Sequence, residues 1–481
     1  MMLSIQTKIF RMMIAVLLFG VTQNSLADSI PAKAAKSLTD PNSATLELEN
    51  QATVEEIRDF VTTYALIKQY YVKPTKDSSL IKGAIGGMVG SIDPHSSYLI
   101  GSDLTDLTNT TDGQFVGVGI EFATDKSTNK VLSVVYSSPA YKAGVLSGDV
   151  ITNVNDESVI DMPLEKLVEK IRGKEDTTIK ITVMRNNKSV LFNLTRKKIK
   201  IKSVQFALID NNKYVYVRIT TFEKNTSNEL AEVLKSIYLR FPEVKGLVLD
   251  LRDNPGGLLQ SAVGVLSIFL PPDSLVLYMK DRYNNIFNFY THATWYNIDG
   301  TQEKEMKSLP IGVKSLPLVV LINQNSASAS EIVSVALQEY HRAKIIGVSS
   351  FGKGSVQQVI PLSKTSALKL TTALYYTPNN QSVQAIGVKP DIWVYSEYQD
   401  ALQSYTFAEN RFSRHLDNPV VSTQKKDNAS NALTIIKPPK QYPLEQLMQI
   451  RKKAVMPVSN WQIIVDPELD FQLKYALKSL P

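Results

Sequence analysis

The sequence predicts an α/β fold in which a mixed β-sheet is flanked by helices and accompanied by a smaller β-rich module. Two stretches predict the sheet, because residues 315–358 and residues 214–251 each read as a strand, a helix and a strand. Residues 113–200 predict the smaller module, since short apolar runs alternate there with turn signals. Periodic apolar positions before residue 112 and after residue 444 predict helical regions at both ends.

Composition and charge exclude several classes of protein. A chain of 481 residues suggests two to four domains, and 43% hydrophobic with 21% charged residues is typical of globular proteins. The net charge of +7 is too dilute over this length to predict a nucleic-acid surface, and no basic run is interleaved with aromatic residues. The absence of cysteine excludes disulfides, thiol catalysis and cysteine-based zinc sites.

The first 27 residues predict a cleavable export signal. Lys8 and Arg11 precede the apolar run 12–21, and small residues at positions 25 and 27 offer a cleavage site. An apolar run of about ten residues is shorter than the roughly 17 to 25 that span a bilayer. We therefore expect cleavage after Ala27 and, for a bacterial chain, a periplasmic product. Residues 28–50 are polar and predict a flexible lead-in.

Residues 51–112 predict an N-terminal helical region. Residues 52–71 carry an apolar stripe at helical spacing, and residues 80–89 predict a second helix. Such stripes usually pack within the same chain, so the pair is expected to cover the core, and a homodimer is the alternative.

The β-rich module covers residues 113–200. Its predicted helices lie near residues 139–143 and 163–171, and its predicted strands are 116–122, 131–135, 179–184 and 190–194.

The larger sheet covers residues 201–400. It is predicted from strands at 214–219, 246–251, 318–322, 343–348, 368–376 and 392–395, with a helix at 227–240 and another beginning near Glu331. Residues 401–481 predict a C-terminal extension, with a linker over 415–443 and helices at 444–448 and 467–480.

Connections between neighbouring parallel strands predict where polar residues meet. Because such crossovers are right-handed, the turns that follow each strand lie at one carboxyl edge of the sheet. Three serines, at positions 326, 328 and 330, follow the strand 318–322, and Lys353 follows the strand 343–348. We therefore expect a serine hydroxyl and a lysine amine to be neighbours.

A neighbouring serine and lysine suit nucleophilic catalysis. A free lysine has a pKa of about 10.4, so the amine acts as a base at neutral pH only when it is partly desolvated. Phe351 and Val356 permit such burial. The simpler alternative is a helix cap beside a surface lysine, since Ser328-x-x-Glu331 also fits a capping box.

Four motifs in this part of the chain resemble those of the C-terminal processing peptidases, also called tail-specific proteases. They are DLRDNPGG at 250–257, SASASEI at 326–332, FGKGSVQ at 351–357 and GVKPDI at 387–392. SIDPHSSYL at 91–99 matches as well, and SPA at 138–140 with the following AG and GD pairs resembles a PDZ domain. The resemblance covers most of residues 50–400.

The resemblance implies a serine peptidase core with an inserted or preceding PDZ domain. It implies that Ser328 is the nucleophile, that Lys353 is the general base and that Gln357 orients the lysine. It also implies an oxyanion hole formed by an amide of Gly256 or Gly257 together with that of Ala329. It implies no metal or organic cofactor.

The PDZ resemblance implies recognition of exposed C-terminal tails of protein substrates, with delivery by a lipoprotein adaptor in parts of the family. Such domains add an extended peptide to a sheet edge and hold its carboxylate in backbone amides. The corresponding residues are Val116, Gly117, Val118, Gly119 and Ile120. Leu164 and Leu167 are expected to line a pocket for the final residue.

Other functions fit the sequence less well. The four histidines form no His-Glu-x-x-His motif, which argues against a zinc peptidase. His341 lies 13 residues beyond Ser328, about 20 Å along one helix, which is too far to take its proton. The alternative from another class is a catalytically inactive periplasmic PDZ scaffold. The joint presence of Ser328, Lys353 and Gln357 argues against it.

Overall fold

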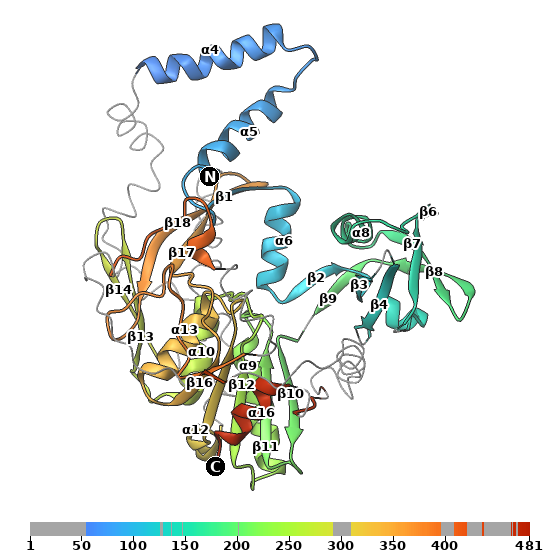
Figure 1. The fold of residues 1–481 in the computed structure, drawn as a ribbon. Helices are drawn as coiled ribbons and strands as arrows, with labels where there is room; N and C mark the ends of the chain where they lie inside the picture. Colours follow the sequence, from blue (N-terminus) through green and yellow to red (C-terminus); the bar gives the residue numbers. More distant parts are fainter. Residues whose placement is uncertain are drawn as a thin grey trace, which may run out of the picture. The chain divides into compact units, whose positions relative to one another are not determined.

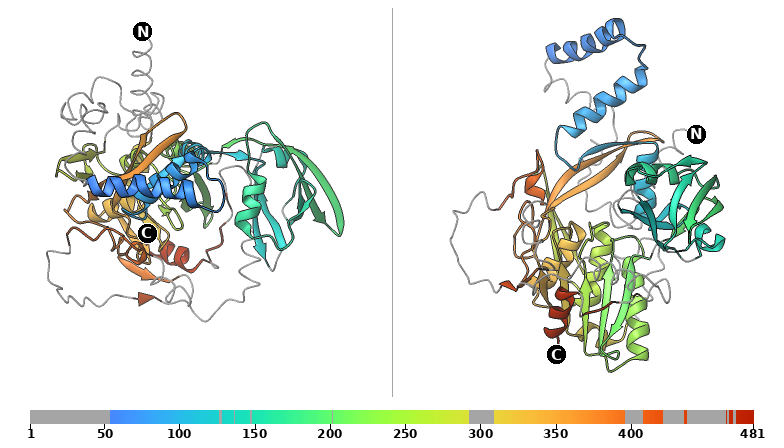
Figure 2. Two further views of the ribbon diagram at one scale, coloured as in Figure 1. Left: turned by 90° about the horizontal axis from the view of Figure 1, so that it is seen from above. Right: turned by 45° about the vertical axis from the view of Figure 1, so that its right-hand side comes forward.

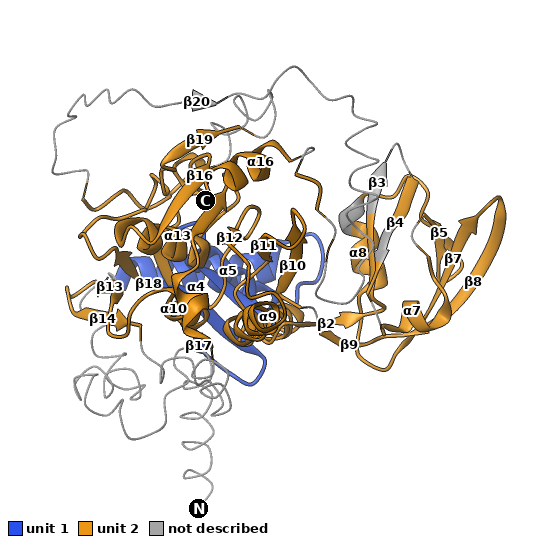
Figure 3. Ribbon diagram, turned by 90° about the horizontal axis from the view of Figure 1, so that it is seen from below, with its two compact units in different colours: residues 1–100, 297–299, 357–371 blue, residues 101–296, 300–356, 372–481 orange. Residues whose placement is uncertain are grey.

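The computed structural model describes residues 54–125, 128–135, 137–146, 148–200, 202–291, 309–395, 408–420, 435–436, 463, 465–467 and 470–481. The chain divides into two compact units (Figure 3). Unit 1 comprises residues 1–100, 297–299 and 357–371, and unit 2 comprises the rest. The predicted export signal, the lead-in and the helix at 444–448 lie outside the described residues. Within the described ranges, no helix has the length and apolar character needed to cross a bilayer.

Unit 2 is built on a seven-stranded sheet, which confirms the predicted α/β class (Figures 1 and 2). All its neighbouring strands are parallel except the first pair. In spatial order the strands are β10 (Val204–Ile209), β11 (Tyr214–Ile219), β12 (Gly246–Asp250), β15 (Leu318–Ile322), β16 (Ala343–Gly347), β19 (Ile392–Val394) and β20 (Ile435–Ile436). The predicted strand–helix–strand units are therefore present, with their strands in parallel register.

Helices cover both faces of this sheet. Three helices pack against one another and against one face: α9 (Thr226–Arg240), α10 (Leu259–Phe269) and α13 (Ala329–Glu339). The C-terminal helix α16 (Phe471–Lys478) packs on β12, β15, β16 and β19. Its Leu473 and Ala476 are fully buried in a cluster with Val248 and Leu321. This burial confirms that the chain ends in a helix packed on the core.

The β-rich module forms a separate six-stranded sheet with its own apolar core. The predicted continuous strand 116–122 is interrupted, because Gly119 has a φ of +83° between β2 (Gln114–Gly117) and β3 (Ile120–Asp125). The sheet order is β3, β4 (Thr128–Val134), β5 (Val150–Val154), β7 (Thr178–Arg185) and β8 (Lys188–Thr195), and β6 (Glu157–Ser158) pairs with β5. The helices are α7 (Pro139–Ala143) and α8 (Leu164–Ile171), and β9 (Lys197–Lys200) pairs with β2.

The remaining elements of unit 2 are α6 (Ser102–Thr111), α12 (Ile311–Ser315), a 3₁₀ turn (Glu409–Arg411), β13 (Leu275–Asp281) and β14 (Ile286–Tyr290). β13 pairs with β14 and with residues 373–376 of β18 (Ser366–Tyr376).

Unit 1 contains the two predicted N-terminal helices, α4 (Val54–Tyr70) and α5 (Asp77–Gly90). The short strand β1 (Ser97–Ile100) follows them and pairs antiparallel with residues 366–369 of β18. Residues 357–361 of β17 (Ser355–Pro361) also belong to this unit, and β17 pairs with β18.

Candidate active site

Three turns at the carboxyl edge of the large sheet form the candidate site. They follow β12, β15 and β16, which are neighbouring parallel strands. The first is the turn 251–258, the second leads into α13 through Ser328, and the third carries Lys353. The structure therefore brings the predicted serines and the lysine loop to one edge of unit 2.

Hydrogen bonds distinguish the three serines. The hydroxyls of Ser326 and Ser330 are fully buried and donate to the carbonyls of Leu251 (2.8 Å) and Asn254 (2.9 Å). Both serines therefore tie the start of α13 to the turn after β12. Ser328 lies between them and is only partly buried. Of the three serines, it is the one that is not fully enclosed in the packing between the two turns.

Ser328 has a strained backbone. Its φ of +53° and ψ of −112° are rare for a residue with a side chain, and it directly precedes α13. Nucleophilic serines of other hydrolases lie on similarly strained turns between a strand and a helix, which expose the hydroxyl.

Glu331 joins the serine turn to the lysine turn. This fully buried carboxylate accepts four hydrogen bonds, from residues in both turns. Its Oε2 accepts the N–H groups of Ser328 and Lys353, both at 2.8 Å. Its Oε1 accepts the Ser350 hydroxyl (2.6 Å) and the Gly352 N–H (2.7 Å). The capping box expected from the sequence includes the bond from the Ser328 N–H. It does not include the three bonds from the lysine turn.

Burial and hydrogen bonding act on Glu331 in opposite directions. Burial raises its pKa from 4.5 to about 7, while the four donors favour the ionised form. Three of the four partners are backbone N–H groups, which only donate, so the Ser350 hydroxyl is the one partner that could accept a hydrogen from a protonated carboxyl group.

The lysine loop is held from both sides. The Lys353 carbonyl accepts the hydroxyl of the buried Tyr375 (3.0 Å), and the Gly354 N–H donates to the buried Gln384 (2.8 Å). The Lys353 side chain is half-buried. The backbone of the lysine loop is therefore fixed by buried side chains on both sides.

The turn after β12 contacts Ser328. A Cβ added to Gly256 would lie only 2.8 Å from the Ser328 Cβ, so a side chain at this position would clash with the serine. The Gly256 N–H donates to Asn254 Oδ1 (2.9 Å). Within the described residues, the N–H groups of Gly257 and Ala329 donate to no protein acceptor. They lie in the turn after β12 and at the start of α13, on either side of Ser328.

An ion-pair network supports the same turn. Arg252 bonds to Asp250 (2.6 Å) and to Asp470 (2.6 Å), which caps α16. Burial alone would raise the pKa of Asp250, but Arg252 and Arg218 lower it overall. This network joins the turn after β12 to the start of α16, and the sequence analysis did not anticipate the contribution of α16. Asp470 lies 218 residues beyond Arg252, in a region without a recognised motif.

Gln357 lies in unit 1, on β17. Its amide Nε2 donates to Thr371 Oγ1 on β18 (3.1 Å).

The predicted PDZ residues 116–120 span the end of β2, a two-residue loop and the start of β3. A Cβ added to Gly119 would lie 2.2 Å from the Ser138 Cβ, so the close approach requires glycine. Among the described residues, the N–H groups of Val118 and Gly119 have no acceptor. Ile120 begins β3, which is the last strand at one edge of its sheet. Leu167 is fully buried in the module core and does not line a surface pocket.

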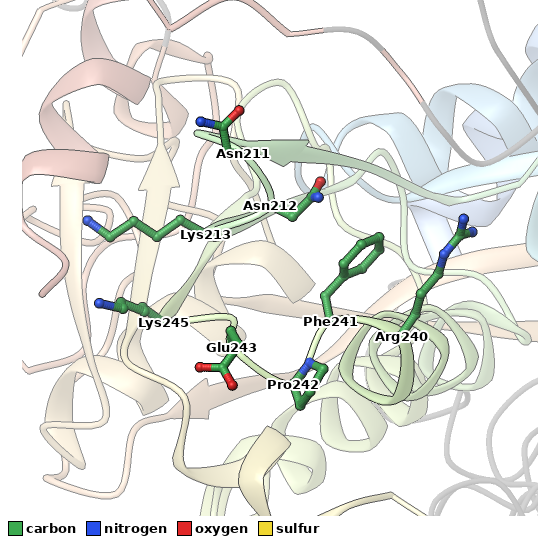
Figure 4. Close-up of a pocket in the computed structure, with 8 residues that line it drawn as sticks. All are labelled: Asn211, Asn212, Lys213, Arg240, Phe241, Pro242, Glu243 and Lys245. Atoms are coloured by element: carbon green, nitrogen blue, oxygen red, sulfur yellow. The ribbon is translucent and has the colours of Figure 1, made fainter.

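A pocket of about 340 Å³ in unit 2 is distinct from this site (Figure 4). Lys213 and Lys245 line it, and these residues precede β11 and β12. The pocket therefore lies at the amino edge of the sheet, whereas Ser328 lies at the carboxyl edge.

Three family models match the chain. They are Peptidase family S41 over residues 213–394, PDZ domain over residues 116–195 and Activating protease CtpB N-terminal domain over residues 16–101.

Named relatives agree with these matches. A carboxy-terminal-processing protease of Bartonella bacilliformis is 37% identical over 392 residues, which cover 80% of this chain and 85% of the relative. A probable CtpA-like serine protease of Staphylococcus haemolyticus is 32% identical over 74% of this chain and 69% of its own length. The solved structure of a photosystem II D1 C-terminal processing protease is 29% identical, covers 69% of this chain and 86% of that one, and has a TM-score of 0.40.

The relatives are named as proteases, which favours an enzyme over the inactive scaffold. The chain belongs to the carboxy-terminal-processing proteases, serine peptidases of family S41 that carry a PDZ domain.

Proposed function

We propose that the protein is an endopeptidase with a Ser328–Lys353 dyad, oriented by Gln357, which cleaves periplasmic proteins near their C-termini. The observation that supports the dyad is the shared Glu331 oxygen. Because the N–H groups of Ser328 and Lys353 both lie 2.8 Å from it, their nitrogens are at most twice that distance apart. In this proposal, residues 1–27 direct export, and substrates arrive directly or on a lipoprotein adaptor.

The proposed reaction begins with proton transfer. The neutral Lys353 amine takes the proton of Ser328 Oγ, which attacks the carbonyl carbon of the scissile bond. The resulting ammonium then gives this proton to the leaving amine, and an acyl-enzyme forms. Water, deprotonated by the same amine, releases the new C-terminus.

The N–H groups of Gly257 and Ala329 are the proposed oxyanion donors. Both lack a protein acceptor among the described residues and come from the two turns that meet at Ser328. Preorganised donors of this kind stabilise the charge that develops on the carbonyl oxygen. Gly256 instead shapes the turn, because its own N–H donates to Asn254.

The proposed task of the PDZ domain is to bind the substrate tail. The N–H groups of Val118 and Gly119 suit a terminal carboxylate, and the free edge of β3 suits an added peptide strand. Ile120, half-buried at the start of β3, contributes apolar surface beside the final residue.

Blocking the substrate carboxylate should slow cleavage. Amidating the C-terminus of a substrate with an apolar tail, or replacing its last residue by Asp, is expected to lower kcat/KM by about tenfold or more. Amidation removes one charge-assisted contact, whereas Asp keeps the terminal carboxylate but places a charged side chain beside the apolar surface of Ile120. The measurement compares initial rates for matched free-acid and amidated substrates well below saturation.

An internal cleavage-site mutation that leaves the tail intact serves as the control, because it should change kcat without affecting tail binding. Equal kcat/KM for the free-acid and amidated tails would contradict a tail-reading role and make the PDZ domain a spacer or lid.

We also propose that unit 1 mediates homodimer formation through α4. None of its residues is buried, and Ile57, Phe60 and Val61 are about half-exposed on one side of the helix. Two copies of α4 in antiparallel arrangement would bring the acidic first turn of each helix to the basic last turn of the other.

Phe60→Glu is therefore expected to convert a dimer into a monomer in analytical ultracentrifugation, because it introduces a charge into the apolar interface. Thr62→Glu adds the same charge on another side of α4 and should leave the dimer intact. A wild-type monomer at micromolar concentration, or equal dissociation of both variants, would argue against this interface.

A further inference from the structure

The loop between α5 and β1 holds a buried carboxylate that belongs to no step of the proposed reaction. Asp93 is 3% exposed and accepts four hydrogen bonds. Its Oδ1 accepts the N–H groups of His95 (2.7 Å) and Ser96 (2.9 Å) and the hydroxyl of Thr371 (3.2 Å). Its Oδ2 accepts the Ser96 hydroxyl (2.6 Å).

These bonds continue to Gln357. The Thr371 N–H donates to Ser96 Oγ (3.0 Å), which fixes this part of β18 beside the Asp93 loop. On its other side, Thr371 Oγ1 lies 3.1 Å from Gln357 Nε2. A chain of hydrogen bonds thus runs from Asp93 through Thr371 to Gln357, all within unit 1.

The direction of each bond in this chain follows from chemistry. Burial alone would raise the pKa of Asp93, but its hydrogen-bond donors lower it overall, so the carboxylate is ionised and only accepts. The single hydrogen of the Thr371 hydroxyl therefore goes to Asp93, and its oxygen accepts from Gln357. The side of the Gln357 amide that faces Thr371 must be the NH₂ group.

A glutamine amide has two nearly isosteric ends, and its orientation is fixed only by its hydrogen bonds. With the nitrogen directed to Thr371, the amide oxygen is directed to the other side. An amide oxygen accepts an N–H of a lysine amine and leaves the nitrogen lone pair available. If the amide were reversed, its NH₂ group would donate a hydrogen bond to the lone pair of the lysine nitrogen. It would then compete with the serine hydroxyl for that lone pair.

We infer that Asp93 and Thr371 are positioning residues, which fix the Gln357 amide in the orientation that its proposed role requires. This inference rests on the proposed function, because it requires that Gln357 orients Lys353. It assigns a role in the reaction to the loop of residues 91–97, which lies more than 200 residues before Ser328 in the sequence. It also explains why a buried carboxylate accompanies an uncharged glutamine.

Thr371→Val tests the inference, because it removes the hydroxyl with little change in shape and suits a β-strand. We expect a kcat lower by about 3- to 10-fold, the effect of one hydrogen bond, with KM unchanged. The acid limb of the pH–rate profile should move to lower pH, because an amide oxygen that no longer faces the ammonium stabilises it less. Thr371→Ser retains the hydroxyl and should retain activity.

The deciding measurement is the same substitution in a Gln357→Ala background, using a reporter protein with a three-alanine tail as substrate. If Thr371 acts through Gln357, Thr371→Val should cause no further loss of kcat there. A full additional loss, or a normal kcat in Thr371→Val itself, would overturn the inference. A normal kcat in Gln357→Ala alone would instead refute the proposed role of Gln357. Melting temperatures of all variants distinguish these outcomes from unfolding.

Discussion

Lys353→Ala and Ser328→Ala are each expected to lower kcat by at least about 10³-fold, with nearly unchanged melting temperatures. Removing either member of a nucleophile–base pair disables the whole unit, so the double variant should be no worse than either single one. Lys353→Arg should be equally inactive, because arginine stays protonated and cannot accept the serine proton. The measurement is kcat on a substrate with a free apolar tail, together with thermal unfolding.

Matched controls separate chemistry from packing. Lys344→Ala removes an exposed lysine from β16 of the same sheet and should leave kcat unchanged. Ser330→Ala removes a buried hydroxyl that bonds to Asn254, so it should lower stability by about 1 kcal/mol and keep substantial turnover. Substantial cleavage by Lys353→Ala would rule out the dyad. Activity should also rise with pH as the lysine loses its proton, and an acid optimum would indicate a carboxylate mechanism.

The sequence predicted the framework of unit 2 because its central strands are short, mostly apolar runs separated by clear turn signals. The strands 318–322 and 343–348 were placed within one residue, and right-handed crossovers then brought their following turns to one edge. The N-terminal helices and α16 were found by their periodicity. The break in the strand 116–122 was missed, since it depends on the positive φ of Gly119 and its contact with Ser138.

The site was predicted less completely, because long-range hydrogen bonds leave no periodic signal. Sequence spacing alone did not separate Ser328 from its two neighbours, whereas the structure places those two hydroxyls on carbonyls of the turn after β12. The sequence also does not reveal that the Gly256 N–H donates to the Asn254 side chain, whereas the proposed donor Gly257 has no such contact among the described residues. The sequence did not indicate Asp470 as a partner of Arg252, because the two residues are 218 positions apart.

Glu331→Gln is expected to lower kcat by about 100-fold, the scale of a small misplacement of catalytic groups. The carboxylate accepts two donors on each oxygen, and an amide has only one accepting oxygen. Either the Ser328 and Lys353 amides or the Ser350 and Gly352 donors would then face an NH₂ group. The two turns should therefore separate, and stability should fall by roughly 2–4 kcal/mol.

The pH dependence of stability gives an independent test of Glu331. Because burial raises its pKa to about 7, the folded state binds this proton more tightly than the unfolded state, whose value is near 4.5. Its contribution to stability is thus fully present below about pH 4.5 and is lost as pH rises to about 7, by up to about 3 kcal/mol. Glu331→Gln should lack this component when unfolding free energies are compared across that range.

Glu339→Gln, at the other end of α13, is the matched control and should leave both kcat and the pH dependence of stability as in the wild type. A Glu331→Gln enzyme with normal kcat would mean that the serine and lysine turns keep their positions without the carboxylate. The expected combination, low activity with a flatter pH dependence, follows only if one buried charge holds both turns. That combination would support the proposal that Glu331 holds Ser328 and Lys353 in position for the reaction, at a cost in stability near neutral pH.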